Sequence, residues 1–551
     1  MDEISVKEKT IKMIDDLKAV CSQNGLGGSP SEYKIITQMF LYKFINDKFI
    51  YEAKKVDKNV ANSDSAEAYL SNLSNDDYEW LKESISSNTA KLLPKQFISY
   101  LFNHQNIPKF DELFDSTLEE ISTLNLDVFS VKAGASENND KIRLFDSELS
   151  RSVTESSKRA SFCAALINKI VEAGSFEEVF DQKYDFFAAV FEYLIKDYNK
   201  DFGKYAEYYT PHSIATIIAK IMVPEEVNNV RVYDPAAGSG TLVLALAHAI
   251  GENNCSIYTQ DISQKSSEFI RLNLILNNLV HSLNNVAHDD TLLSPAHKNS
   301  SNTALAKFDY IVSNPPFKTD FSDTRDTLAG ENYKERFWAG VPNIPNKDKD
   351  KMAIYLMFLQ HIIFSLEDNG KAAVVVPTGF LTAQAKIEKG IRTKLIEEHW
   401  LRGVISMPSN IFANTGTNVS ILFIDKANEN DNVVLMDASK LGKKVKEGKN
   451  QKTVLNNDEM NRIVEVFNNR AEEEDFSVLA SFDEIKEKNY SFSAGQYFEI
   501  KIVHIDITAE EFRQKLSEHI TTLNALTAEG VELDNQINEQ LKKLKFNDTE
   551  C

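Results

Sequence analysis

The sequence predicts an α/β fold, in which a mainly parallel sheet lies between two regions that are mostly helical. Three observations predict it: a short apolar strand that runs into a glycine-rich turn and a helix, later strands that each end in a polar residue, and a strand that is stopped by two consecutive prolines. Strands that alternate with helices are typical of parallel sheets. The 551 residues suffice for two or three domains, and we expect boundaries near residues 170 and 426.

Residues 1–170 are expected to form the first helical domain. Its clearest signal is Ser29-Pro30-Ser31-Glu32, which has the form of a capping box with proline at the first helical position. The apolar residues of 33–51 recur at helical spacing and predict a helix with a wide apolar face. That face is expected to pack in the core of this domain.

The first strand of the sheet is expected at 230–233, followed by Asp234, a turn that contains Gly238 and Gly240, and a helix from Thr241. A strand, a glycine-rich turn and a helix form the opening of a nucleotide-binding unit. The glycines allow a ligand to approach the backbone, because a Cβ would clash there. No lysine follows as in a phosphate-binding P-loop, and the third glycine of the dinucleotide motif is missing.

Each later strand is expected to carry a polar group to the same edge of the sheet. The second strand, 256–261, ends in Asp261, at a spacing that fits an acid binding ribose hydroxyls. A third strand-like stretch ends near Asp290, and a fourth, 308–313, ends at Asn314. These residues indicate a cofactor that contains adenosine, and they lack a motif that binds pyrophosphate. The combination points to S-adenosylmethionine and to methyl transfer.

The fourth strand must stop at Asn314, because Pro315 and Pro316 can neither continue a helix nor donate to a sheet ladder. This stiff corner presents two hydrogen-bond acceptors, the Asn314 amide oxygen and the Pro315 carbonyl, beside the ring of Phe317. Two acceptors next to a flat ring suit a planar exocyclic amine, and adenine N6 is the obvious candidate. A covalent cytosine mechanism would need a cysteine next to the proline, and none stands there.

These motifs resemble those of the N6-adenine DNA methyltransferases, and among them the modification (M) subunits of type I restriction-modification systems. The resemblance covers residues 33–426. Asp234 to Gly240 looks like the cofactor loop of this family, Asn314 to Phe317 like its catalytic motif, and Glu207 to His212 like the segment that closes over the cofactor. The resemblance implies a Rossmann-like S-adenosylmethionine-dependent methyltransferase domain at residues 171–426.

The resemblance also implies a role for each matching residue, and no metal ion. The catalytic corner would consist of Asn314, Pro315, Pro316 and Phe317, with the Phe317 ring stacked on a flipped adenine. The residues that would bind S-adenosylmethionine are Glu207, Tyr208, Tyr209, Thr210, Pro211, His212, Asp234, Gly238, Ser239, Gly240, Thr241, Asp261 and Asp290. Asp261 stands where many relatives carry glutamate, so its side chain reaches less far. The implied activity is site-specific adenine methylation of DNA.

The net charge of −21 is unexpected for a protein that grips DNA alone, which should show basic patches. Few residues follow Lys426, so recognition of the DNA sequence is expected to lie with a partner. The resemblance implies the same: an M subunit pairs with a specificity (S) subunit, usually two M to one S, and a restriction (R) subunit can join. Residues 427–551 are expected to be a helical region that docks on the partner, with two helices separated at Gly530.

The four cysteines are scattered, with no Cys-x-x-Cys pair, and are expected to be reduced thiols in a cytoplasmic protein. No apolar run approaches the length of a membrane span, so no membrane association is expected. The long polar stretch 318–351 could close over DNA or be a plain surface loop.

Two other functions remain open. Corners of the Asn-Pro-Pro-aromatic type also occur in enzymes that methylate a guanine amine of RNA or a glutamine amide of protein. The helical domain and the match at 207–212 argue against that alternative. The chain could also be a non-catalytic scaffold that binds cofactor and partner only, and the intact stretch from Asn314 to Phe317 argues against this one.

Overall fold

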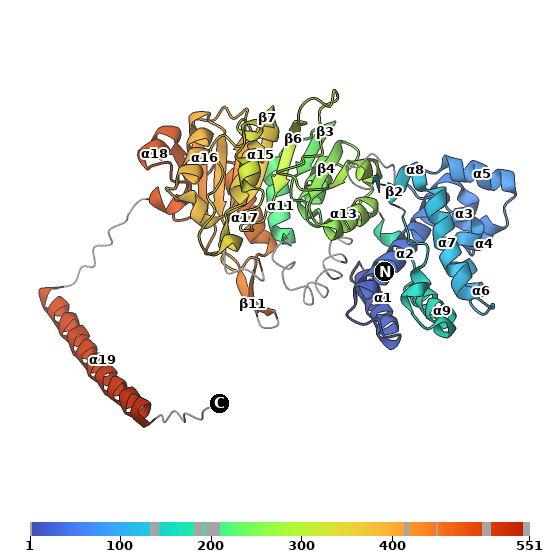
Figure 1. Cartoon of the computed structure of the whole chain (residues 1–551), viewed down its shortest axis with the longest axis horizontal. Coiled ribbons are helices and arrows are strands. Elements are labelled where there is room, and N and C mark those ends of the chain that lie inside the picture. The colour runs from blue at the N-terminus through green and yellow to red at the C-terminus, as the bar shows by residue number, and fades with distance from the viewer. Residues whose placement is uncertain are drawn as a thin grey trace. The chain divides into compact units, whose positions relative to one another are not determined.

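The computed structural model describes residues 3–129, 131–132, 141–142, 144–180, 190, 193, 210–412, 418–447, 450–498 and 508–543. The chain divides into two compact units, Met1–Phe498 and Glu499–Cys551. The first unit contains the N-terminal helices and the sheet, and the described part of the second is one long helix (Figure 1). Among the described residues, no helix combines the length and the apolar character needed to cross a bilayer.

The N-terminal region is helical, as the sequence predicts. Helix α2 begins where the capping box predicts, because the Ser29 hydroxyl accepts a hydrogen bond from the Glu32 backbone N–H at 3.2 Å. The apolar face of α2 is buried, and the helix continues beyond the predicted end at residue 51. The helices of this region are α1 (Glu3–Gln23), α2 (Pro30–Val56), α3 (Lys58–Asn62), α4 (Ala66–Ser71), α5 (Asn75–Ser84), α6 (Ile98–His104), α7 (Phe110–Leu124), α8 (Leu126–Phe129) and α9 (Ser156–Glu172). Short 3-10 turns and one strand pair complete it: η1 (Pro94–Gln96), η2 (Leu149–Ser152), η3 (Glu177–Val179), β1 (Val131–Lys132) and β2 (Lys141–Ile142).

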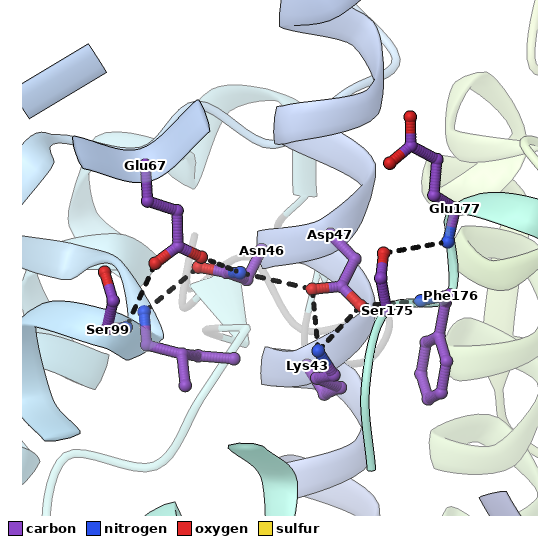
Figure 2. A network of polar contacts seen from close by, with 9 residues as sticks. Lys43, Asn46, Asp47, Glu67, Ser99, Ser175, Phe176 and Glu177 are labelled. Atoms are coloured by element: carbon purple, nitrogen blue, oxygen red, sulfur yellow. Dashed lines mark hydrogen bonds and ion pairs between the residues drawn. The ribbon is translucent and has the colours of Figure 1, made fainter. Parts of the chain in front are cut away.

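A buried polar network joins α2 to the segment that leaves the helical region (Figure 2). Lys43 and Asp47, one turn apart on α2, form an ion pair at 2.8 Å, and Asp47 Oδ2 accepts a hydrogen bond from the Phe176 backbone N–H at 2.9 Å. Asn46 donates to Asp47 and, at 2.9 Å, to Glu67. Burial raises the pKa of Asp47, and its contacts with Lys43 counteract that shift. The network therefore fixes where the chain departs toward the sheet.

The central sheet has nine strands in the order β13-β10-β8-β9-β7-β6-β3-β4-β5. The pairs from β7 through β6, β3 and β4 to β5 are parallel, and β9 runs antiparallel between β7 and β8. The strands are β3 (Val230–Asp234), β4 (Cys255–Asp261), β5 (Val286–His288), β6 (Phe308–Ser313), β7 (Leu366–Pro377), β8 (Leu401–Ser406), β9 (Val419–Asp425), β10 (Asn432–Asp437) and β13 (Ser477–Ser481).

The sheet continues beyond residue 426, where we expected a helical region to begin. Strand β10 pairs in parallel with β8, and β13 pairs antiparallel with β10 at the edge. The expectation of a helical region from residue 427 is therefore wrong up to Phe498, because the apolar run of β10 is buried in the sheet rather than in a helix. A further hairpin, β11 (Lys443–Glu447) and β12 (Asn450–Val454), follows β10.

Helices cover both faces of the sheet, so successive strand residues are buried in different cores. Val232 packs in one apolar cluster and its neighbour Tyr233 in another. The first cluster includes residues of α11 (His212–Met222), α12 (Thr241–Ile250), α13 (Gln264–Leu276) and α17 (Asn457–Asn468). The second includes residues of α15 (Tyr355–Ser365), α16 (Lys386–Glu397) and α18 (Phe482–Glu487). The remaining elements are η5 (Val280–Asn285), α14 (Arg325–Leu328), η6 (Glu331–Tyr333), η7 (Lys349–Lys351), η8 (Thr378–Leu381) and η9 (Ala494–Gln496).

The order of the strands creates a switch point beside β3. From β3 the chain builds β4 and β5 on one side and then returns to place β6 on the other side. In open α/β sheets, the crevice for a ligand lies outside the carboxyl ends of the strands at such a point. The ends of β3 and β6, at Asp234 and Ser313, mark this crevice.

The second unit contains the helix α19 (Ala509–Lys543), which runs through Gly530 without a break. The expectation of two helices separated at Gly530 is therefore wrong. A glycine inside a helix costs only about 1 kcal/mol relative to alanine, which the residues on either side can outweigh. The described side chains of this helix are exposed, including nine large apolar ones.

Candidate active site

The corner that follows β6 is held from both sides. Ser313, fully buried, donates a hydrogen bond from its hydroxyl to Asp234 Oδ1 at 2.8 Å. The next residue, Asn314, donates from Nδ2 to Thr210 Oγ1 at 3.2 Å. The second bond joins the Asn314 amide to Thr210, and no described residue donates to its Oδ1. The amide oxygen therefore has no described donor.

Phe317 completes the corner as a half-buried ring. It meets Tyr355 edge to face, with ring centroids 6.4 Å apart and an interplanar angle of 80°, and Tyr355 packs in the same manner on Phe380. Pro315 is buried and Pro316 half-buried. The contact with Tyr355 favours one orientation of the Phe317 ring, because aromatic pairs prefer edge-to-face geometry.

The glycine turn after β3 has the backbone that the sequence predicts. Gly238 and Gly240 have φ values of 54° and 82°, a region that side chains disfavour. A Cβ on Gly240 would lie 2.7 Å from Ile270 Cδ1. Beside the turn, Ser239 Oγ and Thr241 Oγ1 share a hydrogen bond at 2.9 Å. The turn is therefore tight enough to require glycine at Gly240.

Asp261, at the end of β4, is bonded directly to the glycine turn. Its Oδ2 accepts from the Gly238 backbone N–H at 2.9 Å, and its Oδ1 accepts from the Ser263 N–H at 2.8 Å. Burial raises the pKa of Asp261, and these backbone bonds counteract the shift. Asp261, which is predicted to bind the ribose, is thus adjacent to the predicted cofactor loop.

Asp234 is the second acid of the crevice, and it is buried. Burial raises its pKa to about 7, against hydrogen bonds from the Ala236 N–H and the Ser313 hydroxyl that lower it, and Asp261 raises it further. Among the described residues, no lysine or arginine forms an ion pair with either acid. A buried carboxylate without a cation is costly, so Asp234, which lies beside the half-buried Asp261, suits a positively charged ligand. S-adenosylmethionine, which carries a sulfonium and an ammonium group, fits this requirement.

Asp290 lies on a turn and not at the end of a strand. Strand β5 ends at His288, earlier than expected, because Asp290 Oδ1 accepts from the backbone N–H groups of Leu292 and Leu293 at 2.8 and 3.2 Å. The Thr291 hydroxyl donates to the Pro235 carbonyl at 2.7 Å. The Asp290 turn is therefore joined to the start of the glycine turn.

Gln260 organises this region, and sequence reasoning missed it. The side chain is fully buried; its Nε2 donates to the Ser294 carbonyl at 2.9 Å and its Oε1 accepts from the Ala296 N–H at 2.9 Å. An amide on a strand beside Asp261 was the available signal, because a buried amide in an apolar strand needs polar partners.

The stretch 318–351 packs against the Asp290 turn. Arg336, only 5% exposed, donates to the Leu292 carbonyl, and the Tyr333 hydroxyl donates to the Leu293 carbonyl at 3.3 Å. The Arg336 guanidinium also lies over the ring of Phe337, which is buried in a core cluster with Leu292. Sequence reasoning missed Arg336, and the stretch is a folded support rather than a plain surface loop.

The described part of the segment before α11 begins at Thr210 and contacts the corner. Thr210 is buried and contacts Asn314; Pro211 is buried, and His212 begins α11. The other predicted residues of this segment, Glu207, Tyr208 and Tyr209, lie outside the described residues. The structure thus brings together Thr210, Asp234, the glycine turn, Asp261 and Asn314 at one edge of the sheet.

Comparisons with known proteins agree with this geometry. Residues 182–504 match the family model of the N-6 DNA methylases. The MpnII type I restriction enzyme methylase subunit of Mycoplasma pneumoniae is 29% identical over 385 residues, 68% of this chain and 67% of that protein. The MjaIX type I methylase subunit of Methanocaldococcus jannaschii is 28% identical over 400 residues, 69% of this chain and 67% of that protein.

The fold is shared with a solved structure. The type I restriction-modification methyltransferase subunit of Streptococcus thermophilus has a TM-score of 0.69 at 22% identity, over 91% of this chain and all of that chain. The family match spans more than half of the chain, including the glycine turn and the Asn314 corner. The chain therefore belongs to the N-6 DNA methylase family, and its Mycoplasma and Methanocaldococcus relatives are type I restriction enzyme methylase subunits.

Proposed function

We propose that the chain transfers the methyl group of S-adenosylmethionine to N6 of an adenine in a specific DNA site, as the M subunit of a type I complex. The observation that carries this proposal is the orientation of Asn314. Its Nδ2 is bonded to Thr210, so its Oδ1 is available to an incoming amine at the edge where Asp234 ends β3.

The cofactor is proposed to lie across the carboxyl ends of β3, β4 and β5. Asp234 would meet the ammonium group of the methionine part, and the backbone of the turn Gly238–Thr241 would contact the same part. Asp261 would accept hydrogen bonds from the ribose, and Asp290 would approach the cofactor adenine. Thr210, with the preceding Glu207 to Tyr209 and the following Pro211 and His212, would cover it.

The target adenine is proposed to rotate out of the duplex, at a cost of roughly a few kcal/mol. Stacking on Phe317 offsets about 1–3 kcal/mol of that cost. Asn314 Oδ1 and the Pro315 carbonyl accept hydrogen bonds from N6, which favours a tetrahedral nitrogen as positive charge develops on it. S-adenosylmethionine supplies the methyl group on a positively charged sulfur. The enzyme also positions the nitrogen in line with that methyl group. This positioning accounts for most of the remaining rate enhancement.

Recognition of the DNA sequence is proposed to lie with an S subunit, in a complex of two M to one S that an R subunit can join. The net charge of −21 supports delegation to a partner. Helix α19 offers a surface for docking: its exposed Leu516, Leu523, Leu526, Leu533 and Ile537 fall on coiled-coil core positions. We propose that this face packs on helices of the S subunit.

The test is a methylation assay with tritiated cofactor and duplex DNA, with and without the S subunit. The expected product is N6-methyladenine, formed only with both subunits present. Asn314→Ala should abolish transfer and retain cofactor binding, whereas Asn430→Ala, at an exposed asparagine, should retain both. Activity of Asn314→Ala close to that of the wild type would refute the mechanism. Label in RNA or protein but not in DNA would favour the other substrates, and no label with any of them would favour a scaffold.

A further inference from the structure

The hairpin of β11 and β12 is strongly basic in an acidic chain. Residues 440–454 contain six lysines and one glutamate, whereas the whole chain has a net charge of −21. The two strands pair antiparallel, with Lys444 opposite Thr453 and Lys446 opposite Gln451. Side chains alternate between the two faces of a hairpin, so lysines lie on both.

Four lysines at the start of the hairpin are exposed and form no ion pair with a described carboxylate. Lys440, Lys443, Lys444 and Lys446 are exposed, and no described carboxylate lies within ion-pair distance of any of them. Lysines on the N-terminal helices behave differently, because many pair with a glutamate one turn away, as Lys109 does with Glu112. These four lysines therefore concentrate positive charge on one part of the hairpin.

The base of the hairpin is fixed to the body of the first unit. Thr453 donates from its backbone N–H to the Asn410 carbonyl at 2.9 Å and from its hydroxyl to the Ser409 carbonyl at 2.6 Å. The Gly442 N–H donates to Glu459 Oε1 at 2.8 Å, and a Cβ on Gly442 would lie 2.5 Å from Thr453 Cγ2. The hairpin is thus held in one orientation at its base.

The hairpin leaves the sheet at the edge that carries Asn314. It follows the end of β10 and is bonded to the residues after β8, and both strands run in the same direction as β6. Figure 1 shows β11 projecting from the body beside α17. Four strand spacings separate β10 from β6, which places the base of the hairpin about 19 Å from the corner along the edge.

We propose that this hairpin binds the phosphate backbone of the DNA duplex whose adenine enters the Asn314 corner. The proposal rests on the proposed function, which requires a duplex along this edge. Half a helical turn of DNA spans about 17 Å, so the hairpin meets phosphates roughly half a turn from the target base. Lysine is suited to such contacts because the backbone carries one charge per about 1.7 Å.

The test compares two full-length variants with the same change in charge. Lys443→Gln, Lys444→Gln and Lys446→Gln are combined in the hairpin variant. The control combines Lys109→Gln, Lys158→Gln and Lys169→Gln, at lysines that pair with glutamates on their own helices. Binding to a fluorescein-labelled duplex is measured by anisotropy over a range of salt concentrations, for the chain alone and with the S subunit.

The hairpin variant should bind the duplex about five-fold more weakly per lost contact at about 0.15 M salt. The slope of log affinity against log salt should become less steep by about 0.9 per lost contact. The control should match the wild type, and S-adenosylmethionine affinity should be equal in all three. A hairpin variant that matches the control, while the wild type binds and methylates DNA, overturns this inference alone. Loss of the complex with the S subunit at unchanged DNA affinity also overturns it, in favour of a protein partner. A wild type that neither binds nor methylates DNA in either form overturns the proposed function as well.

Discussion

Asn314 and Thr210 are joined by a hydrogen bond from Asn314 Nδ2 to Thr210 Oγ1 at 3.2 Å, across 104 residues of sequence. In this arrangement Nδ2 is bonded to the threonine hydroxyl, which leaves the amide oxygen for a ligand. The proposed reaction needs an acceptor for the N6 amine. This acceptor therefore depends on a residue that precedes the first strand of the sheet in the sequence.

Thr210→Val should lower the methylation rate, because it removes the hydroxyl that orients the amide. One neutral hydrogen bond contributes about 1 kcal/mol, so we expect kcat to fall roughly five- to ten-fold. Thr210→Ser keeps the hydroxyl and should restore the rate. Steady-state methylation kinetics check this. A Thr210→Ser variant as slow as Thr210→Val would mean that the methyl group, and not the hydroxyl, matters.

Binding of S-adenosylmethionine should tighten as the pH rises toward neutrality. Burial raises the pKa of Asp234 to about 7 in the free protein, so this carboxyl is mostly protonated below that pH. A cationic ligand favours the carboxylate, and its affinity should rise by up to about ten-fold per pH unit below pH 7 and then level off. Calorimetry in buffers of different ionisation enthalpy should detect release of a proton on binding.

Asp234→Asn is the control for that pH dependence. It should weaken binding and abolish both the proton release and the dependence on pH. The stability of the fold should change with pH in the opposite direction from cofactor binding. The pKa of Asp234 is higher in the folded than in the unfolded chain, so this group favours folding at acidic pH. It loses that contribution as the pH rises to about 7. Binding that weakens between pH 6 and pH 8 would contradict the assignment of Asp234.

Arg336 and Tyr333 should affect cofactor binding without contacting the target base. They donate to the carbonyls of Leu292 and Leu293, whose N–H groups bind Asp290. Tyr333→Phe removes one neutral hydrogen bond and should weaken S-adenosylmethionine binding about five-fold with little change in kcat. Arg336→Met should have a larger effect, because it removes a buried donor.

A double-mutant cycle separates this positioning role from general destabilisation. If Arg336 acts through the turn, the effects of Arg336→Met and Asp290→Asn on cofactor affinity should be less than additive. Arg462→Met, at an arginine paired with Glu473 on the surface, serves as the matched control and should not change affinity. Strict additivity would assign Arg336 a structural role only.

The elements with local signals could be predicted from the sequence, and those held by distant contacts could not. The glycine turn and the Asn314 corner depend on neighbouring residues, and β3 and β6 follow the predicted ranges to within a residue. Arg336 is 44 residues from its acceptor Leu292, and no spacing rule relates them. The link between Thr210 and Asn314 likewise needs the folded chain.

The C-terminal part differs from the prediction for two physical reasons. The run Val433–Met436 has strand character, but its place in the sheet depends on pairing with β8 and β13. Gly530 does not break the helix, because its cost of about 1 kcal/mol is small within a helix of 35 residues.

Gly240→Ala should destabilise the first unit, whereas Gly379→Ala should not. An added Cβ at Gly240 meets Ile270 at 2.7 Å in a backbone conformation with φ of 82°, and at Gly379 it meets nothing within 4 Å. The combined clash and strain should cost about 1–3 kcal/mol. Thermal unfolding should show a lower Tm for Gly240→Ala alone. Equal Tm values would mean that Ile270 and the turn adjust without cost.

The apolar face of α19 should be required for assembly with the S subunit and not for cofactor binding. Leu523→Asp combined with Leu526→Asp places two charges at adjacent core positions of the face, and should prevent copurification with that subunit. Ser517→Asp combined with Asn524→Asp places two charges on the opposite side of the helix and should leave assembly intact. Because α19 belongs to the second compact unit, S-adenosylmethionine affinity should be equal in both variants. Copurification of the Leu523 and Leu526 variant at the wild-type level would show that the partner binds elsewhere.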